Sequence, residues 1–234
     1  VSIIIPTRNC LTLLRACIES IQKKTIYPDY EIIIVDNGSN DSELLDYLRH
    51  AVSTHRNFKV VRIEGPFNHS ELNNAAVKLS NGDFIVFLNN DVTVISPEWL
   101  TEMMGLAIQQ GVGAVGSKLY YPDGRVQHAG VVLGLGSDRI AGCAHNGIEK
   151  NSHGYFGRAS LINSFSAVTA ACMLVKKEIF EHVGGFDEVN LPVSYNDVDI
   201  CLRIMEAGYR NVFTPYAELY HHESSSRGRG VKDE

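Results

Sequence analysis

The stretch Phe84-Ile85-Val86-Phe87-Leu88-Asn89-Asn90-Asp91 decides the fold of this 234-residue chain. Five consecutive apolar residues predict a strand buried on both faces, as in a parallel sheet covered by helices. The polar triplet follows where that strand should end, and ligands of open α/β sheets collect beyond the carboxyl ends of the strands. A carboxylate flanked by two amides suits a hard cation and phosphate oxygens. The alternative is an ordinary strand-end turn, because Asn and Asp are common turn residues.

Strand and helix patterns alternate before this stretch. Apolar runs predict strands over 2–5, 31–35 and 58–63, and helical spacing predicts helices over 11–21, 42–48 and 72–79. Asp41 or Ser42 is expected to cap the second helix. This alternation predicts an α/β fold with a mostly parallel central sheet and helices on both faces.

The second half has a less regular pattern. A helix is expected over 97–108, with Ser96 as its N-cap and Pro97 at its first position. Strands are expected over 114–119, 125–133 and 211–214, and helices over 176–182 and 197–207. Residues 167–175 are a small, apolar run. Residues 134–163 predict a long loop, and such loops are usually functional or mobile. Without repeat or linker, one domain over 1–234 is the simplest organisation.

Composition limits the class of protein. The formal charge of −6 argues against binding nucleic acid through a general basic field, and no run of about 18 apolar residues predicts a membrane span. Five cysteines without a CxxC pair indicate small, largely buried residues of a reduced protein. Because the chain opens directly on strand residues, we expect a domain cut from a longer polypeptide, or one numbered without its start. The expected location is the cytoplasm, including the inner face of the cell membrane.

Three polar clusters follow apolar runs, and the carboxyl ends of parallel strands meet at one sheet edge. The clusters are Thr7-Arg8-Asn9, Asp36-Asn37-Gly38-Ser39 and Asn89-Asn90-Asp91. Asp36 could accept hydrogen bonds from a base or a ribose hydroxyl, and Arg8 could meet a phosphate. An Asx-turn is the alternative for Asp36. Neither a GxGxxG motif after the first strand nor a Walker lysine loop is present.

Two further clusters carry titratable groups. Asp197 and Asp199 point in different directions from a helix, so we expect Asp197 to face the pocket and Asp199 to pair with Arg203 four residues on. Both acids could instead serve only the helix dipole. His221-His222-Glu223 offers a metal-binding imidazole, and the arginines that follow, Arg227 and Arg229, could grip a diphosphate. A solvated tail is the alternative there.

Together these motifs resemble the family 2 glycosyltransferases of GT-A fold, over nearly the whole chain. The resemblance rests on Ser2-Ile3-Ile4-Ile5-Pro6-Thr7-Arg8-Asn9, Ile34-Val35-Asp36-Asn37-Gly38-Ser39, Phe87-Leu88-Asn89-Asn90-Asp91, Gly184-Gly185-Phe186-Asp187-Glu188, Asn196-Asp197-Val198-Asp199-Ile200-Cys201-Leu202-Arg203 and His221-His222-Glu223. Gln127-His128-Ala129-Gly130 and the ending His-His-Glu-Ser are similar to bacterial rhamnosyltransferase-type members that act on surface polysaccharides.

The resemblance implies a role for each matching position. Asp36 would read the base of a nucleotide-sugar, Asp91 would bind Mn²⁺ or Mg²⁺ within a DXD-like element, Asp197 would be the catalytic base, and His221 would contact the metal or diphosphate. The remaining donor-binding positions would be Pro6, Thr7, Arg8, Asn9, Asn37, Asn68, Asn73, Asn89, Asn90 and Arg227. Two residues depart from the family pattern, since Asn89 and Asn196 stand where acids are usual.

The resemblance also implies an inverting, metal-dependent transfer from a UDP- or dTDP-linked sugar to a glycan or lipid-linked hydroxyl. Residues 1–95 would bind the nucleotide, and 96–234, including the 134–163 loop, would meet the acceptor and supply the base. Segments outside this chain could add peripheral membrane association. The alternatives are a sugar nucleotidyltransferase, which should carry a glycine-rich basic loop after the first strand, and a catalytically degenerate nucleotide-sugar-binding module.

Overall fold

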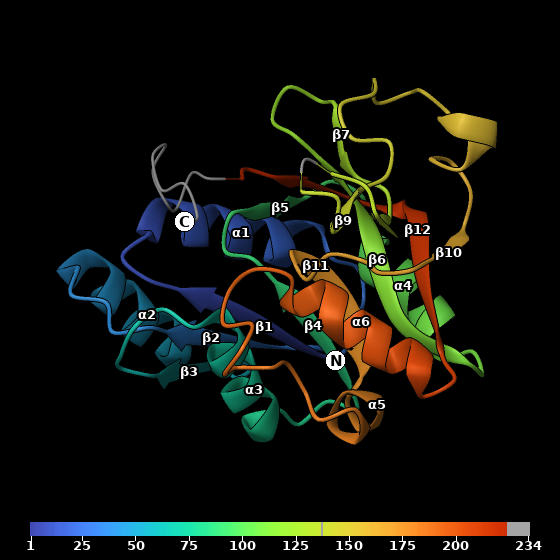
Figure 1. The fold of residues 1–234 in the computed structure, drawn as a ribbon. Helices are drawn as coiled ribbons and strands as arrows, with labels where there is room; N and C mark the ends of the chain where they lie inside the picture. The colour runs from blue at the N-terminus through green and yellow to red at the C-terminus, as the bar shows by residue number, and fades with distance from the viewer. Residues whose placement is uncertain (137, 224–234) are drawn as a thin grey trace.

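A computed structural model of the chain describes residues 1–136 and 138–223. One sheet runs through the molecule in the strand order β10-β12-β6-β11-β4-β1-β2-β3, and Figure 1 shows helices around it. Strands β3, β2, β1, β4, β6 and β12 run in one sense, whereas β11 and β10 run opposite to them. The expected α/β architecture with a mostly parallel central sheet is therefore confirmed.

The strands of the described residues are β1 (Ser2–Thr7), β2 (Glu31–Asp36), β3 (Phe58–Arg62), β4 (Phe84–Leu88), β5 (Val92–Val94), β6 (Val112–Tyr120), β7 (Val126–His128), β8 (Val131–Leu133), β9 (Ala141–Cys143), β10 (Asn163–Phe165), β11 (Cys172–Lys176) and β12 (Arg210–His221). The helices are α1 (Leu11–Lys24), α2 (Ser42–Thr54), α3 (His69–Leu79), α4 (Trp99–Ala107), the short 3₁₀ turn η1 (Tyr155–Gly157), α5 (Lys177–His182) and α6 (Asn196–Glu206). None of the described helices is long and apolar enough to cross a membrane.

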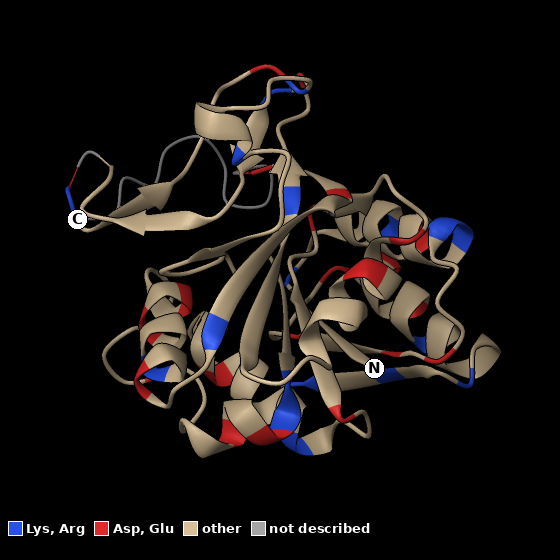
Figure 2. Ribbon diagram, turned by 90° about the vertical axis from the view of Figure 1, so that its right-hand side faces the viewer, with Lys and Arg blue, Asp and Glu red and all other residues tan. Residues whose placement is uncertain are grey.

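Strand alternation sends successive side chains to opposite faces of the sheet, and each face has its own core. Ile3, Ile5 and Ile34 pack with α1, α2 and α4 on one face. Ile4 and Ile33 pack with α3, α5 and α6 on the other. Figure 2 shows helices on both sides of the sheet, with most charged residues on the outer helices and loops.

Helix α4 begins later than expected. Glu98 is its N-cap, rather than Ser96, and the helix starts at Trp99. Ser96 is engaged elsewhere: its Oγ accepts a hydrogen bond from the Glu218 N–H at 2.9 Å, and its own N–H donates to the Glu218 carbonyl at 3.2 Å. These contacts bind Ser96 to β12, so the helix starts at a later residue in the sequence.

Two other expectations about strands were wrong in extent. The run 125–133 forms two short strands, β7 and β8, because Gly130 bends the chain at φ +95°. A side chain there would also collide with Phe165, since an added Cβ would lie 2.4 Å from its ring. The last strand continues well past the expected 211–214, although its pairing with β6 shifts register between Phe213 and Glu218. Pro215, which has no N–H to donate, lies in that interval.

The expected 134–163 loop is mostly irregular, as predicted, but it contains β9, which pairs with β8 in a separate two-stranded sheet, and η1. Strand β11 takes up only the end of the apolar run 167–175 and continues to Lys176, and residues 167–171 form connecting backbone before it. As expected, Cys17, Cys172 and Cys201 are buried.

Candidate active site

Asp91 and His221 meet at the carboxyl edge of the sheet. Asp91 follows β4 and is only 4% exposed. The short strand β5 then pairs antiparallel with the end of β12 and sets His221 opposite Val92. The imidazole Nε2 of His221 lies 3.2 Å from Asp91 Oδ1, and the His222 N–H donates to the Asp91 carbonyl at 2.9 Å. Residues 130 positions apart thereby form one site.

Gln127 fixes which nitrogen of His221 faces Asp91. The His221 Nδ1–H donates to Gln127 Oε1 at 2.8 Å, and Gln127 Nε2 donates to Glu223 Oε2 at 2.9 Å. Because the Gln127 amide oxygen can only accept, His221 must carry a proton on Nδ1. In the neutral ring, Nε2 therefore presents its lone pair toward the Asp91 carboxylate.

Two electron-rich atoms at this separation repel unless something positive lies between them. A divalent cation supplies that charge, and carboxylate oxygen with imidazole nitrogen suits Mn²⁺. A proton shared by the two groups is the alternative. The Asn89 amide nitrogen is 3.3 Å from the same Nε2. Among the described residues, no group of three or more His, Cys, Asp or Glu gathers around a possible metal position. A cation here would therefore need further ligands, such as diphosphate oxygens and water.

The ring of His222 contacts Thr93 and not the Asp91 carboxylate. Its Nε2 lies 3.4 Å from the Thr93 hydroxyl. Of the two adjacent histidines, it is thus the His221 ring that converges with the carboxylate.

Asp197 occupies the first turn of α6, and its carboxylate is held by backbone. Oδ2 accepts from the Ala170 N–H at 3.2 Å, and Oδ1 accepts from the Val198 N–H at 2.8 Å. Burial raises the pKa of Asp197, while these hydrogen bonds and one from the Thr169 side chain act to lower it. A carboxylate with a raised pKa has increased affinity for a proton, which suits a general base.

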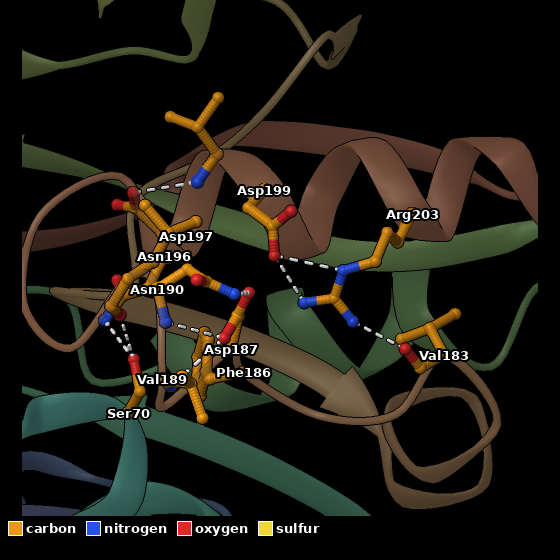
Figure 3. Close-up of polar contacts among 12 residues, drawn as sticks. Ser70, Val183, Phe186, Asp187, Val189, Asn190, Asn196, Asp197, Asp199 and Arg203 are labelled. Atoms are coloured by element: carbon orange, nitrogen blue, oxygen red, sulfur yellow. Dashed lines mark hydrogen bonds and ion pairs between the residues drawn. The ribbon is translucent and has the colours of Figure 1, made fainter.

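Asp199 has the structural role expected for it. Its Oδ2 accepts from Arg203 Nη2 at 2.5 Å and from Nε at 3.0 Å. Figure 3 shows Asp199 turned toward Arg203, with Asp197 directed away from that pair.

The two acidic centres lie on one continuous edge. Strand β11 pairs antiparallel with β4, and the Asn89 N–H donates to the Ala171 carbonyl at 3.1 Å. The neighbouring residue, Ala170, donates to Asp197. One short segment before β11 therefore joins the Asn89-Asn90-Asp91 triplet to the first turn of α6.

Asn196, which stands where the family usually has an acid, connects α6 to α3. It is 3% exposed, and its Nδ2 donates to Ser70 Oγ at 2.9 Å (Figure 3). The uncharged amide allows this buried contact without the desolvation cost of a carboxylate. Asn196 thus anchors the start of the helix that carries Asp197.

Asp36 is buried at the end of β2 and has both carboxylate oxygens engaged. Oδ1 accepts from the Ser39 N–H at 3.0 Å, as the turn alternative anticipated. Oδ2 accepts from Arg62 Nη1 at 2.6 Å, an ion pair. Arg62 is the register partner of Asp36 on β3. The expected contact with the base of a nucleotide-sugar would have to use the remaining lone pairs of the Asp36 carboxylate, which already binds Ser39 and Arg62.

Asparagines expected to bind the donor also hold the loops of this edge. Asn9 Oδ1 accepts from the Asn40 N–H at 2.9 Å, and Asn68 caps α3 by accepting from the Glu71 N–H at 3.0 Å. Asn90 is buried and its Nδ2 donates to Thr7 Oγ1 at 3.0 Å, linking β4 to β1.

Asn37 and Asn73 each bury an amide oxygen that has no hydrogen-bond partner among the described residues. Their amide nitrogens donate to the backbone oxygens of Ile63 at 3.1 Å and His69 at 2.7 Å. Pro6 is buried within β1, whereas Arg8 is exposed beyond it. Arg227 lies outside the described residues.

Sequence reasoning did not assign roles to Arg62, Thr169 and Ala170. The signal for Arg62 was its place at the end of a strand neighbouring the Asp36 strand. Thr169 and Ala170 act through one hydroxyl and one backbone N–H, which a sequence pattern does not reveal.

Comparison with known proteins identifies the family of the chain. Residues 2–184 match the profile "Glycosyl transferase family 2". The chain belongs to that family. It is a glycosyltransferase domain, and the family resemblance expected from its motifs is confirmed.

Several relatives extend the match over nearly the whole chain. It is 38% identical to the "O-antigen biosynthesis protein RfbC" of Myxococcus xanthus over 97% of the chain and 18% of that protein. It is 53% identical to the "Uncharacterized protein y4gI" of Sinorhizobium fredii, covering 97% of the chain and 25% of that protein. The "O-antigen chain rhamnosyltransferase RfbN" of Salmonella typhimurium is 25% identical over 94% of the chain and 66% of that protein. The chain thus spans a quarter or less of the first two relatives.

Solved structures share the GT-A fold. A mannosyltransferase from Pyrobaculum calidifontis in complex with GDP-Man and Mn²⁺ superposes with a TM-score of 0.69 at 17% identity, covering 97% of this chain and 58% of that one. GalNAc-T7 with UDP, GalNAc and Mn²⁺ gives a TM-score of 0.73 at 16% identity, over 94% of this chain and 43% of that one. At these identities the likeness establishes the fold.

Proposed function

We propose that this domain is an inverting, metal-dependent glycosyltransferase of cell-surface polysaccharide synthesis. It would move a sugar from a UDP- or dTDP-linked donor to a hydroxyl of a glycan or lipid-linked acceptor. The observation that supports this most is the 169–171 segment, which contacts Asn89 beside the Asp91–His221 pair and also Asp197. The Asp91–His221 pair would bind the cation and Asp197 would act as the base. A single displacement reaction needs both groups at the same edge of the sheet.

In this mechanism Asp197 takes the proton of the acceptor hydroxyl while its oxygen bonds to the anomeric carbon. The bond from that carbon to the diphosphate breaks, and its electron pair leaves with the nucleoside diphosphate. Mn²⁺ or Mg²⁺ held by Asp91 and His221 would supply Lewis-acid stabilisation of the leaving diphosphate. Attack from the face opposite the leaving group inverts the anomeric centre, and the single base matches that stereochemistry.

The relatives support the substrate class by their names, since two are O-antigen proteins and one of these is a rhamnosyltransferase. The Mn²⁺ complexes among the structural neighbours support the choice of cation. A thermal-shift screen of UDP-, dTDP- and GDP-sugars, with Mn²⁺ and with EDTA, identifies the donor. Stabilisation by GDP-sugars alone would overturn the proposed donor class.

The variant pair Asp197→Asn and Asp199→Asn tests the base. We expect Asp197→Asn to lower turnover by a factor of about 10² to 10⁴, the usual contribution of a general base, and to leave donor affinity within about twofold by calorimetry. Asp199→Asn, which breaks only the Arg203 pair, serves as the matched control and should retain most of the turnover. Full transfer by Asp197→Asn would remove Asp197 as the base. Donor binding without transfer to any acceptor, in the unaltered domain, would favour the degenerate binding module.

A further inference from the structure

His128 is a buried histidine at the end of β7 that the proposed reaction does not use. It is 1% exposed, and its Nδ1 lies 2.8 Å from the Ser117 carbonyl oxygen. Its Nε2 accepts hydrogen bonds from the N–H groups of Gly130 and Thr169, each at 3.3 Å. A carbonyl on one side and two N–H donors on the other allow one arrangement only, the neutral ring protonated on Nδ1.

The Thr169 contact leads directly to Asp197. The Thr169 side chain hydrogen-bonds the Asp197 carboxylate, and the next residue, Ala170, donates its N–H to Asp197 Oδ2 at 3.2 Å. The same segment is also joined to β8, where the Val131 N–H donates to the Ala167 carbonyl at 2.9 Å. His128 therefore holds one end of the backbone that carries both donors to Asp197.

We infer that His128 is a positioning residue for Asp197: its neutral Nε2 anchors the Thr169–Ala170 segment, so that the two donors of that segment set the place and the basicity of the carboxylate. This inference rests on the proposed function for its catalytic consequence. It also gives a physical reason for the Gln127-His128-Ala129-Gly130 motif. Gln127 orients His221 on the metal side, and His128 orients the segment on the base side.

The chemistry of the ring explains why another buried residue would not serve. An apolar side chain would fill the space but leave the Thr169 N–H without an acceptor, and an unsatisfied buried donor is unfavourable. A protonated imidazole would direct an N–H at two other N–H groups. Burial favours the neutral form and lowers the pKa of His128 to about 4. The ring thus remains an acceptor across the neutral pH range.

Two substitutions separate the two ends of the ring. In His128→Asn the amide nitrogen occupies the place of Nδ1 and retains the Ser117 contact, but nothing reaches Thr169. In His128→Gln the longer side chain brings an amide oxygen to the place of Nε2 and retains the Thr169 contact. His50→Asn, at an exposed histidine of α2, is the matched control.

The decisive readout is the pKa of the Asp197 carboxyl, measured by ¹³C NMR titration. Hydrogen bonds from the segment lower this pKa, so their loss in His128→Asn should shift it upward, and His128→Gln should restore it toward the wild-type value. Turnover should fall about tenfold or more in His128→Asn, since a displacement of 1 Å can cost about 10²-fold, with donor KM changed by less than about twofold. An unchanged Asp197 pKa in folded His128→Asn would overturn the inference.

A measurement on the unaltered protein covers the case in which His128→Asn does not fold. Long-range ¹H–¹⁵N spectra distinguish the two tautomers, and we expect His128 to be protonated on Nδ1 alone. A proton on Nε2 would overturn the inference without any variant. Failure of the proposed function is separate, because full activity of Asp197→Asn would remove the base yet leave the pKa coupling between His128 and Asp197 intact.

Discussion

At the residue scale, the site depends on side chains whose partners fix their chemical state. His221 presents a lone pair to Asp91 because Gln127 Oε1 accepts the hydrogen bond from its Nδ1–H. Gln127 is oriented in turn by Glu223. Hydrogen bonds of this kind, made by residues behind a metal-binding side chain, fix its tautomer and its orientation.

Removing the Gln127 side chain tests this dependence. We expect Gln127→Ala to weaken Mn²⁺ binding by about 10- to 100-fold, because the His221 ring loses the partner that fixes its tautomer and orientation. Electron paramagnetic resonance of free Mn²⁺, with the donor nucleotide present, measures the change. Gln109→Ala, at an exposed glutamine after α4, is the control. Unaltered Mn²⁺ affinity in Gln127→Ala would mean that His221 is not a ligand.

At the element scale, helix starts place the functional groups, and each start is held by a different device. Helix α6 begins where Asn196 reaches Ser70 on α3. Helix α2 is capped by Asp41, whose carboxylate accepts from the Glu43 and Leu44 N–H groups. The sequence left Asp41 and Ser42 as equal candidates, and the structure selects Asp41.

A pair of alanine variants checks that selection. Asp41→Ala should lower the free energy of unfolding by about 1 kcal/mol, the usual value of an N-cap side chain. Ser42→Ala lies inside the first turn and should change it by less than about 0.5 kcal/mol. Urea denaturation followed by circular dichroism measures both. Equal losses in the two variants would contradict the assignment of the cap.

Ser70→Ala tests the start of α6 in the same way. The Asn196 amide would lose a buried partner, which costs about 1–3 kcal/mol. Ser53→Ala, on the exposed face of α2, is the control. If the two variants unfold at the same urea concentration, the Asn196–Ser70 contact does not stabilise the fold.

At the scale of the whole molecule, the buried neutral His128 couples stability to pH. Its folded-state pKa of about 4 lies below the value of about 6.5 for an unfolded chain. Between these values the unfolded state binds more protons, so stability rises with pH over this window and is lost as pH falls through it. The full effect is about 3 kcal/mol at most. Urea unfolding at pH 4.5 and 7 measures it, and His128→Gln should show a smaller difference. An identical pH dependence in that variant would assign the effect to other groups.

The sequence predicted elements best where hydrophobic period and strand length agree. Phe84–Leu88 was predicted with its observed bounds, since five apolar residues before a polar triplet allow little else. The prediction failed where a residue that looks like a helix cap is bound instead by a strand distant in the sequence. Ser96 has the composition of an N-cap, but β12 binds it. Strand β12 was underestimated because Pro215 interrupts the pattern while the partner strand β6 continues.

By itself the sequence determined the family, the parallel core of the sheet and the identity of the charged candidates, because apolar period and strand-end polarity are local properties. The pairing of Asp91 with His221, of Asp36 with Arg62, and of His128 with the backbone beside Asp197 was decided only by tertiary structure. Each of these contacts joins residues far apart in the chain. Their geometry depends on strand register and on loops that no local pattern encodes.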